Sequence, residues 1–289
     1  GGILPEARLA RDGEGWVALA SFHPVLPTPV QEAPRNVKLV VDCSGSMSGD
    51  SIAQAREALA TILEELGPRD HFNIVTFGTR HRRLFPGQVP ADGEPLEAAR
   101  RLAEELGADM GGTEIKAALD AAYGSRGAQD TPPDVLLVTD GQSYDERAVV
   151  GAARESGHRV FSVGVGSAVS EAFLGRLAEE TGGALERVSP REDMAERIVR
   201  QFRRMGQPRA REVTVRWDRA PERESPEGLE AVHAGDTVHV FAWFQEGPEG
   251  EAVLLADFAD GTRTWERAGL PAQGREEHTD LLPRLGAWQ

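Results

Sequence analysis

The sequence predicts an α/β domain with a doubly wound, mostly parallel sheet, inserted in a β-sandwich domain. Between residues 36 and 205, short apolar runs alternate with segments of helix length, the pattern of right-handed crossovers in a parallel sheet. From Glu212 onward the hydrophobic period is two, which is typical of antiparallel strands. One further strand candidate, Trp16–Phe22, precedes the α/β region. Because one strand is not stable alone, we expect it to pair with strands near the other end of the chain.

This interpretation divides the chain into segments. A proline-rich connector follows the first strand candidate, and the ending LLPRLGAWQ resembles the first turns of a helix. We expect residues 1–35 to hold an N-terminal strand of the sandwich and a linker, 36–206 the α/β domain, 207–275 the rest of the sandwich, and 276–289 the start of a C-terminal helix or linker.

The central strand is predicted by Val37, Leu39, Val40 and Val41, a nearly continuous β-branched run of the kind that is buried on both faces of a parallel sheet. A helix with Asp50 or Ser51 as its N-cap should follow at residues 52–66. The same patterns predict further strands at 71–77, 82–85, 135–139, 159–165 and 184–188, and helices at 96–106, 115–122, 170–181 and 194–202. In the β region, strands are expected at 213–217, 237–244, 252–258 and 262–266.

Composition limits the classes of function. The chain has 289 residues and a formal net charge of −15, with 47 acidic side chains against 32 Lys and Arg. Nucleic acids and anionic membranes are bound through clustered positive charge, so we expect protein or cation partners, no nucleic acid and no direct membrane insertion. The oligomeric state is left open. The localisation is also open, with the cytoplasm slightly favoured over secretion or the cell surface.

Cys43 is the only cysteine, which excludes an intrachain disulfide and a cysteine-based zinc site. No apolar run is long enough to cross a bilayer. We interpret Cys43 as a small residue that fills its loop, because buried cysteines are usually inert.

Oxygen-bearing side chains follow the predicted central strands. Asp42, Ser44 and Ser46 lie at i, i+2 and i+4 after the first strand, Thr113 follows a glycine-bent loop, and Asp140 ends a second buried strand. In an open α/β sheet the loops at the carboxyl ends of central strands share one crevice, so these five side chains can converge there. Carboxylates and hydroxyls are hard ligands, which favours Mg²⁺, with Mn²⁺ or Ca²⁺ as alternatives.

In this arrangement the chain resembles the von Willebrand factor A domain, whose metal-ion-dependent adhesion site has the pattern D-x-S-x-S with a later Thr and Asp. The resemblance implies that Ser44, Ser46 and Thr113 are direct or near-direct ligands, and that Asp42 and Asp140 bind the ion directly or through water. The segments GEGWVALASF and EAVHAGDTVHVF, on either side of the A domain, resemble the inter-alpha-trypsin inhibitor heavy chains and their bacterial relatives that combine a VIT domain with an A domain.

The expected function is metal-dependent binding of a protein partner through one of its Asp or Glu carboxylates, without enzymatic activity. Two alternatives belong to other classes. One is a haloacid-dehalogenase-like phosphotransferase that uses Asp42 and has Lys116 as a favourable feature, although Ser44 and Gly141 replace the acidic residues usual in that family. The other is a structural scaffold with an unused metal site.

Overall fold

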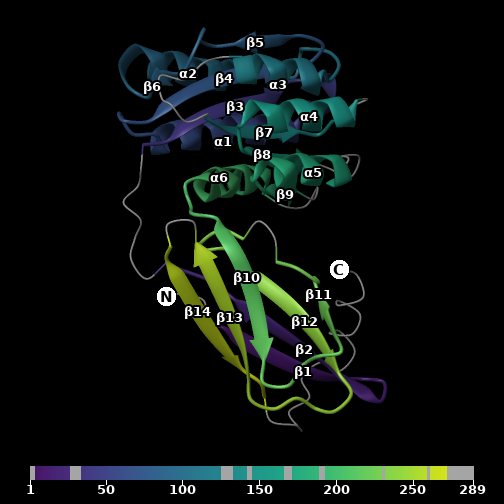
Figure 1. The fold of residues 1–289 in the computed structure, drawn as a ribbon. Coiled ribbons are helices and arrows are strands. Elements are labelled where there is room, and N and C mark those ends of the chain that lie inside the picture. Colours follow the sequence, from purple (N-terminus) through teal and green to yellow (C-terminus); the bar gives the residue numbers. More distant parts are fainter. Residues whose placement is uncertain are drawn as a thin grey trace. The chain divides into compact units, whose positions relative to one another are not determined.

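The computed structural model describes residues 4–26, 34–124, 133–141, 145–165, 171–188, 193–229, 232–258 and 261–271 (Figure 1). The chain divides into two compact units. One unit is the continuous segment Glu32–Gly206, and the other combines Gly1–Gln31 with Gln207–Gln289. Each unit has a hydrophobic core of its own among the described residues.

The continuous unit is built on a seven-stranded sheet in the order β5-β4-β3-β7-β8-β9, with β6 also paired to β4. Strands β3 to β4, β3 to β7, β7 to β8 and β8 to β9 pair in parallel, while β5 and β6 are antiparallel to β4. The strands are β3 (Asn36–Asp42), β4 (His71–Phe77), β5 (His81–Arg83), β6 (Val89–Pro90), β7 (Asp134–Thr139), β8 (Val160–Val165) and β9 (Leu185–Val188).

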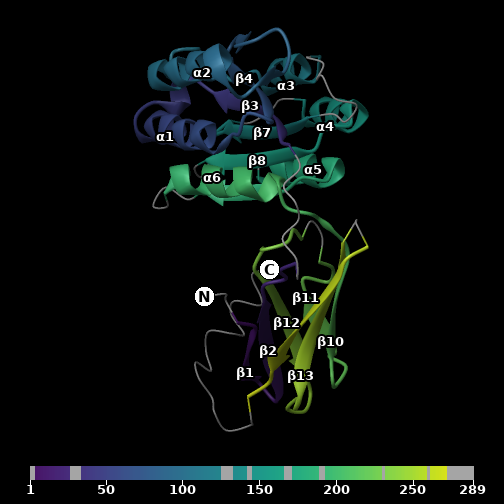
Figure 2. The same ribbon diagram turned by 90° about the vertical axis from the view of Figure 1, so that its left-hand side faces the viewer.

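Helices cover both faces of this sheet (Figure 2). One layer consists of α1 (Asp50–Glu65), α2 (Gly93–Glu105) and α6 (Met194–Met205). The opposite layer consists of α3 (Ile115–Gly124), α4 (Glu146–Ser156) and α5 (Glu171–Thr181). The doubly wound, mostly parallel α/β fold is therefore confirmed.

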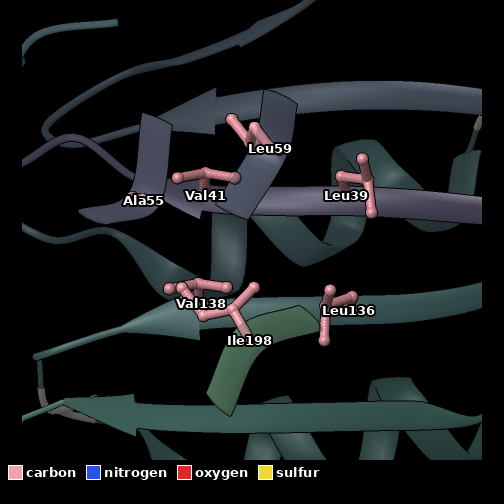
Figure 3. Close-up of a pocket in the computed structure, with 7 residues that line it drawn as sticks. All are labelled: Leu39, Val41, Ala55, Leu59, Leu136, Val138 and Ile198. Carbon is pink, nitrogen blue, oxygen red and sulfur yellow. The ribbon is translucent and has the colours of Figure 1, made fainter. Parts of the chain in front are cut away.

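Apolar side chains of the central strands hold the first helix layer in place. Leu39 and Val41 on β3, with Leu136 and Val138 on β7, project from one face of the sheet because alternate residues of a strand share a face. Figure 3 shows them around a small apolar pocket that Ala55 and Leu59 of α1 and Ile198 of α6 complete. The centre of the sheet is thus buried on both sides, as the continuous apolar run of β3 predicts.

The second unit is a β-sandwich. One sheet has the order β1-β2-β12-β11 and the other the order β10-β13-β14. Their inner faces share a core in which buried residues alternate with half-buried ones along β13. The strands are β1 (Glu6–Asp12), β2 (Gly15–Phe22), β10 (Ala210–Trp217), β11 (Arg223–Ser225), β12 (Val238–Phe244), β13 (Glu251–Phe258) and β14 (Arg263–Gly269).

Strand β2 pairs with β12, which lies beyond the α/β unit in the sequence. The antiparallel register places Phe22 opposite Val238 and Trp16 opposite Phe244. The inner side chains Ala18 and Ala242 are fully buried between the sheets. The pairing confirms that the α/β unit is inserted in a β-sandwich and explains why the isolated strand candidate is stable.

Several expected boundaries were wrong. The edge strand β5 spans His81–Arg83 rather than 82–85, because Phe85 turns inward and packs edge-to-face on Phe72. Helix α2 begins at Gly93 rather than at 96, since Pro95 lies in the first turn, where no N–H is needed. The N-cap of α1 is Gly49, at φ +82°, and neither Asp50 nor Ser51.

Other elements were not predicted. Strand β1 forms a hairpin with β2, and its exposed charged residues weaken the alternating signal. Helix α4 is capped at its start by Asp145, whose carboxylate accepts from the Ala148 N–H, and at its end by the left-handed Gly157. The expected helix or linker at 276–289 lies outside the described residues. No helix in the described ranges has the length and apolar character needed to cross a membrane.

A buried basic pair lies under the second helix layer. The Lys38 ammonium donates to the Ala122 carbonyl at 2.5 Å and lies 3.0 Å from His158 Nε2. Burial, reinforced by the positive charge of Lys38, lowers the pKa of His158 from 6.5 to about 4. Burial, with a smaller contribution from Arg83, lowers the pKa of Lys38 to about 8. The imidazole is therefore neutral at pH 7, and its Nε2 can accept a hydrogen bond from the Lys38 ammonium.

These shifts predict a pH dependence of stability. Between pH 6.5 and 4 the unfolded chain binds a proton at His158 that the folded chain does not, so the free energy of unfolding should fall as the pH falls through this range. The expected contribution is about 1–3 kcal/mol. His158→Gln keeps an acceptor for Lys38 but cannot titrate, so it should lack this contribution. Urea unfolding at pH 7, 6, 5 and 4 measures it.

The matched control is His81→Gln, which replaces an exposed imidazole of the same unit. Its pH profile should parallel that of the wild type. Identical pH profiles for His158→Gln and the wild type would contradict the role assigned to the buried pair.

Candidate functional site

The first loop of the site follows the central strand β3. Asp42 ends the strand, is fully buried, and accepts the Ser44 N–H at Oδ1 over 2.9 Å. A short 3₁₀ turn, Gly45–Met47, then brings the Ser46 hydroxyl within 3.0 Å of the Ser44 hydroxyl. The turn is anchored by the fully buried Met47 side chain. The hydroxyls of the D-x-S-x-S pattern are thus adjacent.

The second loop, residues 110–114, is bonded to the first by its backbone. The Met110 N–H donates to the Cys43 carbonyl at 3.0 Å, and the Gly45 N–H donates to the Gly111 carbonyl at 2.9 Å. These bonds fix the path of the loop just before Thr113. The buried Cys43 side chain fills space beneath it, and burial raises the pKa of its thiol to about 12. The thiol stays protonated, as expected for an inert cysteine.

The third loop follows β7, which pairs with β3. The Thr139 hydroxyl donates to Asp42 Oδ2 at 2.6 Å, and the Ser46 hydroxyl donates to Asp140 Oδ1 at 2.8 Å. The Gly141 N–H in turn donates to the Thr139 hydroxyl at 3.0 Å. Asp42 therefore accepts a hydrogen bond from the end of β7, and Asp140 accepts one from the loop that follows β3.

Thr113 lies against the third loop. A β-carbon placed on Gly141 would be 3.2 Å from the Thr113 β-carbon and 3.3 Å from its hydroxyl oxygen. The absence of a side chain at Gly141 allows this approach. The structure thus brings all five predicted residues, Asp42, Ser44, Ser46, Thr113 and Asp140, to the carboxyl ends of β3 and β7, the point where the sheet connections diverge to opposite sides.

The two carboxyl groups are held in an environment that disfavours their negative charge. Burial is the largest cause of the raised pKa of Asp42, and the charge of Asp140 raises it further, while bonds from Thr139 and Ser44 lower it. Burial also raises the pKa of Asp140, against the bond from Ser46. No Lys or Arg within the described ranges forms an ion pair with either carboxylate. A bound cation would offset this uncompensated negative charge.

The donor set fits a hard cation. It consists of carboxylate and hydroxyl oxygens, the ligands that Mg²⁺ and Ca²⁺ prefer. In the described part of the chain no group of three or more His, Cys, Asp or Glu is arranged to hold a metal. A site here would therefore depend on the neutral hydroxyls as well as on Asp42 and Asp140.

Two positioning residues were missed by the sequence interpretation. Thr139 bonds Asp42, and the Thr79 hydroxyl accepts the Gly112 N–H at 2.8 Å. Thr139 has one signal in the sequence, its position at the end of a predicted strand directly before Asp140, although the register that places Val41 opposite Val138 is known only from the structure. Thr79 gives no comparable signal, since its contact joins loops that are distant in the sequence.

The close approach of the loops predicts a strict requirement for glycine at position 78. A β-carbon at Gly78 would lie 2.5 Å from the Met110 β-carbon and 2.6 Å from its carbonyl carbon. Gly78→Ala should therefore displace the second loop and lower the free energy of unfolding by about 1–3 kcal/mol, as overpacking does. Urea denaturation measures the change.

Gly151→Ala is the matched control, because this helical position has open space around it. The substitution should raise stability by about 0.5–1 kcal/mol through helix propensity. Equal stabilities for the two variants would show that the contact between the loops is not tight.

Comparison with known proteins identifies the family of the α/β unit. The model for the von Willebrand factor type A domain matches residues 35–187. Human inter-alpha-trypsin inhibitor heavy chain H4 is 35% identical over 210 residues, which cover 68% of this chain and 22% of the human protein. Human von Willebrand factor A domain-containing protein 5A is 29% identical over 219 residues, which cover 71% of this chain and 28% of that protein.

Among solved structures, a von Willebrand factor type A protein from Catenulispora acidiphila matches with a TM-score of 0.54 and 18% identity, covering 93% of this chain and 75% of its own. At this identity the likeness concerns the fold alone. The chain spans only 22% and 28% of the two human relatives, so their activities as whole proteins do not transfer. Domains of the matched type generally act as metal-dependent protein-interaction modules and are typically not enzymes. On the family match and on its identity to human relatives, the chain belongs to the von Willebrand factor type A domain family.

Proposed function

We propose that this chain binds a divalent cation, Mg²⁺ first with Mn²⁺ or Ca²⁺ as alternatives, and thereby binds an Asp or Glu side chain of a protein partner. Ser44, Ser46 and Thr113 would hold the ion, with Asp42 and Asp140 bound to it directly or through water. A divalent ion held by these groups supplies an electrophilic position for a carboxylate oxygen from outside.

One observation supports this proposal most directly. The Ser44, Ser46 and Asp140 side chains form a hydrogen-bonded series, with 3.0 Å between the two hydroxyl oxygens and 2.8 Å from the Ser46 hydroxyl to Asp140 Oδ1. This series joins two loops, and its members Ser46 and Asp140 are 94 residues apart in the sequence. Hydroxyls that bond one another in this way are close enough to share one cation. Their neutrality also matters, because an ion with few charged ligands keeps more of its charge for an acidic partner.

Asp42 contributes by its placement. Its two oxygens accept bonds from the Ser44 N–H and the Thr139 hydroxyl, which orient the carboxylate at the base of the site. Thr113 belongs to the half-buried rim beside Gly141. We therefore infer that Asp42 serves mainly to retain the ion and Thr113 to shape its outward side.

The phosphotransferase alternative requires Asp42 to attack a phosphoryl group. The structure disfavours this, because Asp42 is fully buried and both of its oxygens already accept hydrogen bonds. Lys116, the other feature of that alternative, pairs with Asp120 on the same helix at 2.7 Å. The scaffold alternative, in which the site stays unused, is distinguished by metal analysis of the purified chain.

Asp42→Ala should abolish Mg²⁺ and Mn²⁺ binding and leave the fold intact. The substitution removes a charge at the base of the site, while the strand behind it is held by apolar side chains. Isothermal titration calorimetry measures the metal affinity, and circular dichroism checks the fold. Asp140→Asn is a second test, because it removes the charge of a half-buried carboxylate and keeps a side chain of similar shape.

The matched control for metal binding is Asp109→Ala, which removes an exposed carboxylate from the neighbouring loop. Its affinity should equal that of the wild type. If Asp42→Ala bound the metal as tightly as the wild type does, the assignment of the site would be overturned.

Binding of a partner should depend on the ion. In an arrayed library of short peptides, those bound through one Asp or Glu should be released by EDTA, and replacing that acidic residue by its amide should weaken binding by about 2–5 kcal/mol. Thr113→Ala should weaken peptide binding more than metal binding, because it alters the outward side of the site and leaves four other oxygen-bearing side chains.

Thr113→Ser keeps the hydroxyl and should retain most of the peptide affinity. If EDTA leaves peptide binding unchanged, the partner is bound elsewhere on the chain.

A further inference from the structure

We propose that the exposed basic turn at residues 80–83, next to the site, binds a second acidic residue of the same partner, so that the preferred ligand is a segment with two carboxylates a few residues apart. This inference rests on the proposed function and specifies the partner more narrowly.

The turn and the second loop of the site form one bonded rim. The Thr79 N–H donates to the Met110 carbonyl at 2.7 Å, and the Glu114 N–H donates to the Gly78 carbonyl at 2.9 Å. The turn is closed by the Gly78 N–H, which donates to the Arg80 carbonyl at 2.8 Å. Arg80 therefore directly follows Gly78 and Thr79, whose backbones bond residues before and after Thr113 in the second loop. A ligand at the site would lie beside it.

The charge of the turn is unusual for this chain. Four consecutive residues, Arg80, His81, Arg82 and Arg83, are basic or titratable and exposed, in a protein with a net charge of −15. Several other arginines of the α/β unit are paired with acidic neighbours, as are Arg159 with Asp134 at 2.5 Å and Arg197 with Glu186 at 2.7 Å. In the described part of the chain, Arg80 and Arg82 form no such pair. Their charge is available to a partner.

The register of the sheet gives the spacing. Asp42 lies opposite Phe77, and Phe77 lies opposite His81, so His81 is level with Asp42 and two strands away. Two strand spacings are about 10 Å, the length of about three residues of extended peptide. A peptide with one carboxylate at the ion can therefore place a second one, two to four residues away, within reach of the long side chains of Arg80 or Arg82.

Protection of the sheet edge is the competing explanation for these charges. Strand β5 is the edge of the sheet, and exposed charged residues commonly discourage pairing with another chain. That role does not require the charges to improve the binding of acidic peptides. The two explanations therefore differ in a measurable property.

The experiment uses an arrayed peptide library with one fixed Asp and a second Asp or Asn at offsets of one to five residues, measured with the full chain in Mg²⁺ and in EDTA. For the wild type, a second Asp at offsets two to four should strengthen Mg²⁺-dependent binding about three- to tenfold, the size of one charge-assisted contact. The gain should shrink as NaCl is raised, because salt screens exposed charges.

Arg80→Gln with Arg82→Gln should remove the gain from the second Asp and leave both Mg²⁺ affinity and binding of the single-Asp peptides unchanged. Arg80→Lys with Arg82→Lys keeps the charge and should restore part of the gain. The matched control is Arg69→Gln with Arg176→Gln, which removes the same charge from exposed positions elsewhere in the unit and should retain the gain.

The outcomes separate this inference from the proposed function. EDTA-sensitive binding of single-Asp peptides without any gain from the second Asp, or a gain that survives in Arg80→Gln with Arg82→Gln, would overturn the basic-turn inference alone. A library without any EDTA-sensitive binder would contradict both.

Discussion

The structure of the site depends on one buried carboxylate at the end of the central strand. Asp42 loses its contact with water because β3 lies in the middle of the sheet, with β4 and β7 on either side. A charge in this position is costly unless polar groups or a cation compensate for it. The Ser44 N–H and the Thr139 hydroxyl supply part of that compensation, and their positions are fixed by the loops that follow the strands.

The surrounding loops are held by bonds to one another more than by helices or strands of their own. The backbone of the first loop bonds the second, the second bonds the turn after β4, and side chains of the first and third loops bond each other. Close approach of the second loop to Gly78 and of Thr113 to Gly141 requires residues without side chains at those positions. The rim is therefore preorganised before any ligand binds, which lowers the entropic cost of recognition.

The two units illustrate different solutions to the burial of a sheet. The α/β unit covers both faces of a parallel sheet with helices, so its central strands carry continuous apolar runs. In the β-sandwich the main core lies between the facing sides of the two sheets, so buried residues alternate with half-buried ones along β13. Its first sheet is completed by β2 paired with β12, strands that lie before and after the α/β unit in the sequence.

The sequence by itself determined the fold class and the insertion, and it predicted the five oxygen-bearing residues that the structure brings together, because hydrophobic period and the ends of apolar strands are local properties that the chain displays directly. Strand β1 and helix α4 were missed because charged or small residues dilute that local signal. Only the tertiary structure decided that Thr139 bonds Asp42, that Thr79 bonds the second loop, and that the basic turn adjoins Thr113. These contacts join residues far apart in the sequence, and their geometry is set by strand order and register, which no local pattern encodes.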